Sequence, residues 1–171
     1  MKIEVEHRYE RISCEAFVKM YFSVAYNNAI APIVSLKERR IDSEVHLENG
    51  RTERRIFMAP DVALPSVLAK MAAHASIAYT EVSVYDPQTY TVKYHIESAA
   101  QKMISVSGQV MFIADSTAVR RRIQGDVHVK ILGLGHVIER LIASETQKRY
   151  DAVHVFTQDY IDSHQMRDQM P

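Results

Sequence analysis

Hydrophobic and polar residues alternate from the second residue of the chain onward. Between residues 2 and 9, every second position carries an apolar or aromatic residue or, at position 7, a histidine. Charged residues occupy the positions between them. This period of two predicts a half-buried strand, with His7 on its inner face. Ser13 suits a helix N-cap because its hydroxyl can accept a backbone N–H, so a short helix is predicted after it. A second short helix is predicted over 25–30 and ends before Pro32.

The middle of the chain repeats the strand pattern between short turns. Asn49-Gly50 favours a hairpin because both residues tolerate positive φ. Tyr79 and Tyr85 share one strand face, and the pattern leaves open whether that face is the inner one. The turns are short and no long crossover intervenes, which indicates an antiparallel meander. Further strands are predicted over 33–39, 41–48, 51–58, 76–85, 90–97, 103–114 and 117–131.

A long helix is predicted at the C-terminal end. Gly133 and Gly135 end the strand region, and apolar residues then recur at helical spacing. A helix over 136–163 spans ~40 Å at ~1.5 Å per residue and must lie across the concave face of the sheet. We expect residues 1–163 to form a single domain and the polar residues 164–171 to form a frayed tail.

Composition narrows the class of protein. The 171 residues are 47% hydrophobic and 25% charged, which is typical of one globular domain with a sizeable core. The formal net charge is zero, so no nucleic-acid partner is expected, and the arginine clusters at 39–40, 54–55 and 120–122 are interpreted as a solvated sheet surface. Cys14 is the single cysteine, and no run approaches the ~20 apolar residues of a membrane span, so a cytoplasmic location is expected.

The order of the predicted elements resembles the helix-grip fold of the START-like (SRPBCC) superfamily, including its uncharacterised bacterial members. The segment Ile3 to His7 with the helix opening at Ser13 looks like the start of that group, and 133–135 running into 138–142 looks like its final strand-to-helix junction. The resemblance implies an α+β fold in which a curved antiparallel sheet of about seven strands wraps around a long C-terminal helix, with two short helices after the first strand. It also implies a cavity between sheet and helix, which family members use for lipids, sterols, polyketides and other apolar molecules.

Five residues are candidates for ligand contact in such a cavity. Alternation points Arg121 inward, where it needs a partner: a carboxylate such as Glu145, or a ligand carboxylate or phosphate. Glu145 and Arg149 are four residues apart on the long helix, so they form either a polar anchor for a ligand head group or a surface ion pair. Tyr94 and His7 face the core by alternation, where an ordinary structural partner is the alternative for each.

An apolar connector interrupts the strands at residues 59–75. Three interpretations fit it: ordinary core packing, a gate over the cavity, or a contact with a membrane or a partner. The residues assigned to this lid or transient membrane contact are Phe57, Met58, Val62, Leu64 and Leu68.

Known catalytic motifs are absent from the sequence. It contains no HExxH, no zinc-type Cys/His spacing, no glycine-rich phosphate loop and no GxSxG, so neither a metal nor a cofactor is expected. The leading interpretation is binding or transport of a lipid or other hydrophobic small molecule. The alternatives are a polyketide cyclase- or aromatase-like enzyme that uses His7, Tyr94, Arg121 or Glu145, and a non-enzymatic protein-interaction module. Either a monomer or a homodimer is compatible with the sequence.

Overall fold

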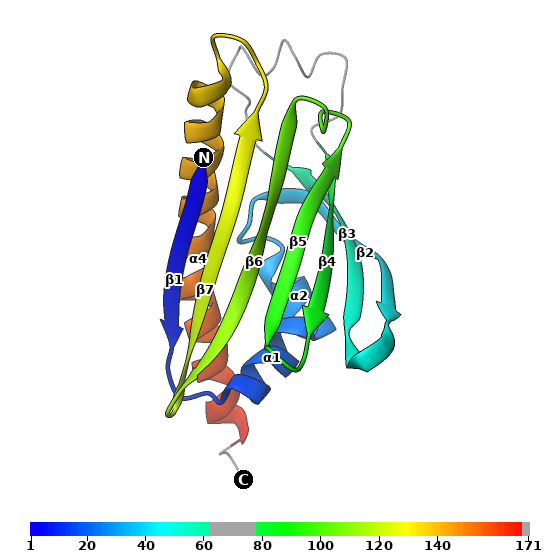
Figure 1. Ribbon diagram of the computed structural model, residues 1–171. Coiled ribbons are helices and arrows are strands. Elements are labelled where there is room, and N and C mark those ends of the chain that lie inside the picture. Colours follow the sequence, from blue (N-terminus) through cyan, green and yellow to red (C-terminus); the bar gives the residue numbers. More distant parts are fainter. Residues whose placement is uncertain (62–77, 169–171) are drawn as a thin grey trace.

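An antiparallel sheet and one long helix make up most of the fold (Figure 1). The structure is a computed structural model that describes residues 1–61 and 78–168. Within these residues the sheet has seven strands in the order β1-β7-β6-β5-β4-β3-β2. In chain order the elements are β1 (Lys2–Tyr9), α1 (Cys14–Phe22), α2 (Val24–Ile30), β2 (Leu36–His46), η1 (Glu48–Gly50), β3 (Thr52–Pro60), β4 (Tyr79–Asp86), β5 (Thr91–Ser98), β6 (Ile104–Asp115), β7 (Ala118–Val129) and α4 (Gly135–Asp168).

Local sequence signals explain where the first elements begin and turn. The predicted first strand coincides with β1. Ser13 caps α1 by accepting the Ala16 N–H at 3.2 Å, and Ser23 caps α2 in the same way. The predicted hairpin at Asn49-Gly50 is confirmed, since both residues have positive φ, at 59° and 72°. These capping and turn preferences therefore act here as the sequence predicts.

The prediction of two strands over 33–39 and 41–48 is wrong, because a single strand β2 covers this region. Its register against β3 shifts between Leu36 and Glu38 and again between Ile41 and Ser43. Each bulge inserts one residue and reverses which face the next side chains occupy. The break in alternation near residue 40 is therefore a change of phase within one strand and not a turn.

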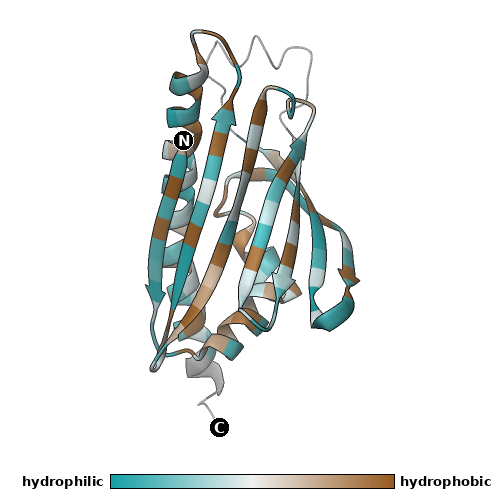
Figure 2. Ribbon diagram, viewed as in Figure 1, coloured by the Kyte–Doolittle hydropathy of each residue, from teal (hydrophilic) through white to brown (hydrophobic). Residues whose placement is uncertain are grey.

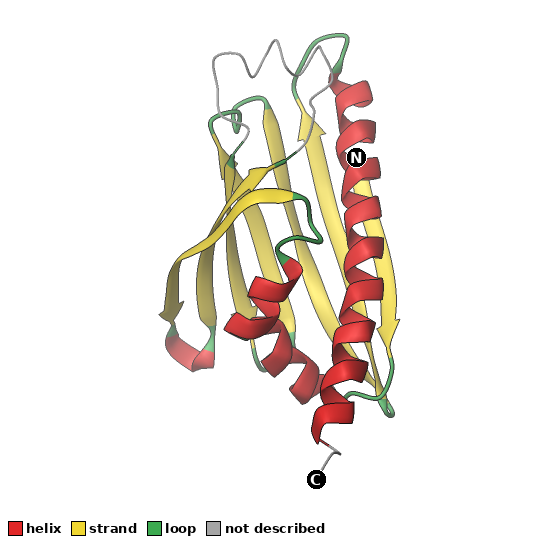
Figure 3. Ribbon diagram, turned by 180° about the vertical axis from the view of Figure 1, so that it is seen from behind, coloured by secondary structure: helices red, strands yellow, loops and turns green. Residues whose placement is uncertain are grey.

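Helix α4 is longer than predicted. It has 34 residues, about 50 Å at ~1.5 Å per residue, and it includes residues 164–168, which were expected to belong to the frayed tail. Figure 3 shows the helix running along the concave side of the sheet, with α1 and α2 near its C-terminal end. Its packing partners in the sheet are β1 and β7. The helix therefore covers one side of the sheet and leaves the inner faces of the other strands less covered.

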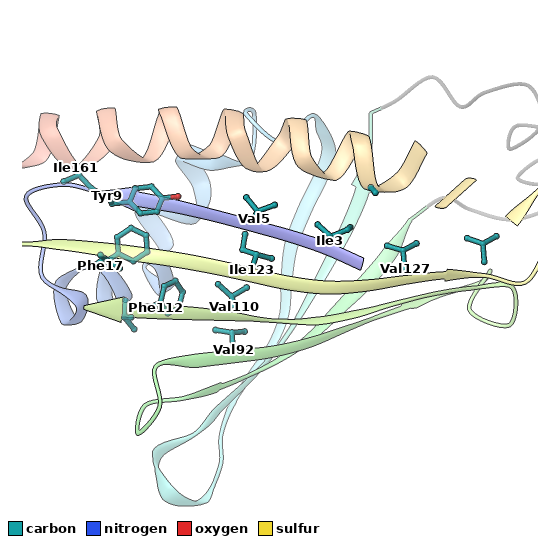
Figure 4. Packing of buried hydrophobic residues seen from close by; sticks show 14 of the residues in the cluster. Ile3, Val5, Tyr9, Phe17, Val92, Val110, Phe112, Ile123, Val127 and Ile161 are labelled. Carbon is teal, nitrogen blue, oxygen red and sulfur yellow. The ribbon is translucent and has the colours of Figure 1, made fainter. Parts of the chain in front are cut away.

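The hydrophobic core follows the seam between α4 and the strands β1 and β7 (Figure 4). Hydrophobic and hydrophilic residues alternate along these strands (Figure 2), so only one face of each contributes. Tyr9 and Phe17 are fully buried, with ring centroids 4.7 Å apart, and Ile123 and Ile161 are nearly so. Burial of each such side chain stabilises the fold by about 1.5–3 kcal/mol. The sheet and the helix thus close on each other along this seam.

Candidate functional site

A cavity of about 820 Å³ lies between α4, α2 and the inner faces of the sheet. Its volume falls within the roughly 300–1,000 Å³ of small-molecule sites. Most of the wall is apolar, and an empty apolar space of this size is far larger than the voids that close-packed cores tolerate. Apolar side chains of the wall include Ile56, Met58, Val92, Ile96, Val106 and Ile142.

Strand β4 supplies polar side chains to the cavity wall. Tyr79, Glu81 and Ser83 occupy alternate positions and all line the cavity. The face that Tyr79 shares with Tyr85, which the sequence left unassigned, is therefore the inner face at this end of the strand. Burial and, to a smaller extent, the neighbouring Glu81 raise the pKa of Tyr79 to about 12, while Arg149 and Arg39 act in the opposite direction.

Glu81 is an isolated carboxyl group in this apolar space. It forms no hydrogen bond or ion pair with any residue of 1–61 or 78–168. Burial raises the pKa of Glu81, because removal from water disfavours the charged form, and Arg39 partly opposes this shift. Buried carboxyl groups are normally paired, so an unpaired one on a cavity wall marks a candidate contact for a bound molecule.

Arg39 enters the same cavity from β2 and is fixed by α2. Its Nη2 donates to Asn27 Oδ1 at 2.7 Å. Asn27 is itself buried, and its amide donates to the backbone oxygens of Tyr21 at 3.0 Å and Ser23 at 2.7 Å. Burial lowers the pKa of Arg39, while Tyr21 and Glu81 raise it. The guanidinium group is therefore held at the cavity wall, and some of its five N–H donors remain available.

Tyr94 crosses the sheet over two glycines. In the strand register Tyr94 pairs with Gly108, which pairs with Gly125. A Cβ on Gly108 would lie 2.8 Å from the Tyr94 hydroxyl oxygen, and one on Gly125 would lie 3.0 Å from it. The phenol thus extends over both strands toward Tyr150 of α4. Burial raises the pKa of both tyrosines, and their hydroxyl groups interact, which lowers that of Tyr94 and raises that of Tyr150. The prediction that Tyr94 faces the interior is confirmed.

Arg121 points inward as alternation predicted, with 3% of its surface exposed. Its Nη2 donates to His7 Nδ1 at 3.3 Å, so its partner is His7 and not Glu145 as suggested from the sequence. The guanidinium carbon also lies over the rings of Tyr9 and Tyr150, at 5.4 Å and 5.9 Å from their centroids. Arg121 therefore lines the cavity, while its hydrogen bond to His7 and its contacts with the two tyrosine rings are directed into the α4 seam.

His7 does not line the cavity, contrary to the expectation that placed it there. Its Nε2 lies 3.0 Å from Asp151 Oδ1, and its ring stacks on His154 with centroids 4.5 Å apart. Arginine can only donate, so Nδ1 of His7 accepts from Arg121 and Nε2 carries the proton that Asp151 accepts. Burial lowers the pKa of His7, as does Arg121, while the Asp151 hydrogen bond opposes the shift. The residue belongs to a polar cluster between β1, β7 and α4, in which Arg121 is buried and Asp151 is exposed.

Glu145 and Arg149 both line the cavity from α4, but they do not form the predicted pair. Glu145 binds Lys148 instead, at 2.8 Å. Arg149 forms no hydrogen bond or ion pair with the part of the chain that the structure describes. Of the two, Arg149 is thus the side chain that is free to bind a ligand group.

Two of the residues assigned to a lid or membrane contact belong to the sheet. Phe57 and Met58 lie within β3, paired to strands on both sides. Met58 lines the cavity, whereas Phe57 is on the opposite face, where the Arg40 guanidinium carbon lies 4.8 Å from its ring centroid. The remaining lid residues, Val62, Leu64 and Leu68, lie outside the described residues.

Two kinds of feature are not found in the described residues. No group of three or more His, Cys, Asp or Glu side chains there is arranged to hold a metal ion. None of the helices described combines the length and the apolar character that crossing a membrane requires.

A family model described as a protein of unknown function (DUF2505) matches residues 4–161. The chain belongs to the DUF2505 family. No curated protein matches this DUF2505 chain.

Solved structures resemble the DUF2505 chain over nearly its whole length. The Zhui aromatase/cyclase from Streptomyces sp. R1128 has a TM-score of 0.66 at 13% identity, covering 95% of this chain and 94% of that one. A START superfamily protein from Mycobacterium smegmatis has a TM-score of 0.60 at 8% identity, covering 95% and 97%. Norcoclaurine synthase from Thalictrum flavum has a TM-score of 0.56 at 13% identity, covering 92% and 87%. The DUF2505 chain therefore has the START-like helix-grip fold.

Sequence reasoning missed two charged residues of the DUF2505 cavity. Glu81 alternates with Tyr79 and Ser83, but the β-branched residues on the other face of its strand are equally suited to a core. Arg39 was grouped with a solvated surface, whereas it lies at the cavity wall and only its neighbour Arg40 is exposed. Alternation within the strand assigns each of the two residues to one face of the sheet. It identifies that face as the cavity wall only once the face covered by α4 is known.

Proposed function

We propose that the protein binds an apolar small molecule, such as a lipid, in the cavity between the sheet and α4. The observation that carries this proposal is the largely apolar cavity of about 820 Å³. Filling it with an apolar ligand removes wall and ligand surface from water, at roughly 25 cal/mol per Å² of apolar area. The START-like fold supports the proposal, because the superfamily it resembles uses the same space for hydrophobic ligands.

Polar groups on the wall give such a ligand an orientation. Glu81 from β4 and Arg149 from α4 have no partner within residues 1–61 and 78–168, and Tyr79 interacts electrostatically with both. A ligand with one polar end gains charge-assisted hydrogen bonds there, and its apolar remainder occupies the rest of the cavity. An amphipathic molecule therefore suits the site better than a pure hydrocarbon.

Native mass spectrometry of the purified protein, with extraction and profiling of any bound molecule, tests the proposal directly. Val106→Phe narrows the cavity from its inner wall, whereas Val84→Phe makes the same change at a β4 position that does not line the cavity. We expect the first variant to lose the bound mass or an added apolar fluorophore, and the second to retain it. Equal retention in both variants, or no binding by the wild type, contradicts the proposal.

A second candidate function is acid–base catalysis on a bound carbonyl compound, and the isolated Glu81 carboxyl favours it. Burial raises the pKa of Glu81, which makes its ionised form a stronger base for proton transfer. The four groups named from the sequence do not assemble for this role, because His7 lies outside the cavity and Glu145 binds Lys148. In the proposed step, Glu81 removes a proton from the carbon beside the carbonyl and returns one from solvent.

Hydrogen–deuterium exchange of 2-tetralone in D₂O, followed by NMR, tests this second candidate. We expect the wild type to accelerate exchange beside the carbonyl and Glu81→Gln to abolish the acceleration. Equal rates for the two proteins refute the catalytic role and leave the binding role intact. Self-association, the interaction-module alternative, stays a prediction that size-exclusion chromatography with light scattering can test.

A further inference from the structure

Glu81 and Arg39 are two opposite charges that share one cavity without forming an ion pair with each other. In the sheet, Arg39 pairs with Met58, which pairs with Tyr79, and Glu81 is the next inward residue after Tyr79 on β4. The two charged residues thus stand two strands apart and two residues out of register, roughly 12 Å between backbones, on the same face. Their side chains rise from either side of an apolar strip.

Apolar side chains form the floor of this gap. Ile56 and Met58 of β3 lie between the strands of the two charges and also line the cavity. Tyr21 and Tyr79 also line the cavity, and the pKa of each responds to both Glu81 and Arg39. The charges influence each other, as each appears in the pKa of the other, yet no protein group among the described residues bridges them.

The chemistry of the two groups restricts what fits between them. When Glu81 is ionised, its carboxylate only accepts hydrogen bonds, and the Arg39 guanidinium only donates them. A ligand carboxylate or phosphate satisfies Arg39 but is repelled by the Glu81 carboxylate. A ligand ammonium group satisfies the Glu81 carboxylate but is repelled by Arg39. A hydroxyl group satisfies both, because it donates to Glu81 and accepts from Arg39 with a single oxygen.

We infer that the gap between Arg39 and Glu81 is a subsite for the hydroxyl group of an apolar alcohol, phenol or enol. This inference rests on the proposed binding function and adds the chemical class of the ligand. Asn27 prepares the subsite by fixing one Arg39 nitrogen from α2, so the remaining donors are already oriented when the ligand enters. Preorganisation of this kind reduces the entropic cost of binding.

Three fluorescent probes of one shape test the subsite: 1-hydroxypyrene, 1-methoxypyrene and pyrene-1-carboxylate. Hydrogen bonds to charged groups lead us to expect the wild type to bind the hydroxyl probe about ten- to a hundredfold more tightly than the other two. Glu81→Leu and Arg39→Met should each remove this preference while 1-methoxypyrene still binds. Retained binding of that probe also shows that each variant is folded.

Glu145→Leu is the matched control, because Glu145 is a second carboxylate on the cavity wall but already binds Lys148. It should leave the hydroxyl preference unchanged. Equal affinity of the wild type for all three probes overturns the subsite and leaves the binding function standing. If none of the three probes binds and Val106→Phe is indistinguishable from the wild type, both the subsite and the proposed binding function are overturned. A preference that survives Glu81→Leu also overturns the subsite.

Discussion

Replacement of Gly125 by Ala probes how Tyr94 is seated in the sheet. The added Cβ lies 3.0 Å from the Tyr94 hydroxyl oxygen and 3.4 Å from the Ser107 carbonyl oxygen. The first distance is too short for a relaxed contact and the second is ordinary, so the strain falls on one side-chain atom. Gly125 is not among the glycines with positive φ, and its backbone therefore accepts alanine.

Two effects set the size of the change. Overpacking of a folded interior costs about 1–3 kcal/mol, whereas Gly→Ala at a permissive backbone position stabilises by about 0.4–1 kcal/mol through the unfolded chain. We expect a net loss of roughly 0.5–2 kcal/mol for Gly125→Ala in the wild type. With Tyr94→Phe the clashing oxygen is gone, so the same substitution should become neutral or stabilising.

Urea denaturation of the four proteins of this double-mutant cycle gives the coupling free energy. Gly108→Ala is the control, because its Cβ would lie 2.3 Å from the Gln124 carbonyl oxygen and 2.8 Å from the Gly125 Cα. Tyr94→Phe removes a third contact, the 2.8 Å approach to the hydroxyl oxygen, but leaves both backbone clashes, so Gly108→Ala should stay destabilising in the Tyr94→Phe protein. An equal cost of Gly125→Ala with and without the Tyr94 hydroxyl would refute the reasoning.

Three further substitutions test single contacts. Thr157→Val should lower the free energy of unfolding by about 1–3 kcal/mol, because the buried Tyr26 hydroxyl loses its hydrogen-bond partner at 2.7 Å. Thr157→Ser keeps that hydrogen bond, and chemical denaturation distinguishes the two variants. Burial lowers the pKa of His7, so the unfolded chain binds protons first and stability falls as the pH drops below about 6.5. His7→Gln should flatten this slope, and the exposed His46→Gln should not; equal slopes would contradict the assignment. Ser13→Ala should cost about 1 kcal/mol by removing the N-cap of α1, and an unchanged unfolding midpoint would exclude that role.

Alternation along each strand was sufficient to predict much of the fold. It located β1 and placed Arg121 and Tyr94 inside, because a period of two fixes faces wherever the pairing is regular. It failed at β2, where two bulges change the phase, so that one strand was divided into two. Periodicity is thus reliable within a regular ladder and not across an irregularity.

The cavity charges were harder to predict for a different reason. Both faces of β4 carry residues compatible with a core, and only the position of α4 decides that Glu81 is inside. The partner of Arg121 depends on a contact 114 residues away in the chain, at His7, and no local pattern encodes such a pairing. Side-chain partners that depend on tertiary packing therefore lie beyond what one sequence reveals.

Arg121 and Glu81 are both charged and both line the cavity, but their surroundings assign them different roles. Arg121 donates to His7 and lies over the rings of two tyrosines, so its contacts are directed into the α4 seam, and its buried Nε has no hydrogen-bond partner among the described residues. Its removal would strand His7 and loosen the seam. Glu81 forms no hydrogen bond or ion pair with the described residues, and the desolvation of its carboxyl group destabilises the unliganded protein. A carboxyl that destabilises the unliganded fold is the better candidate for binding a ligand, because a bound molecule can offset that cost.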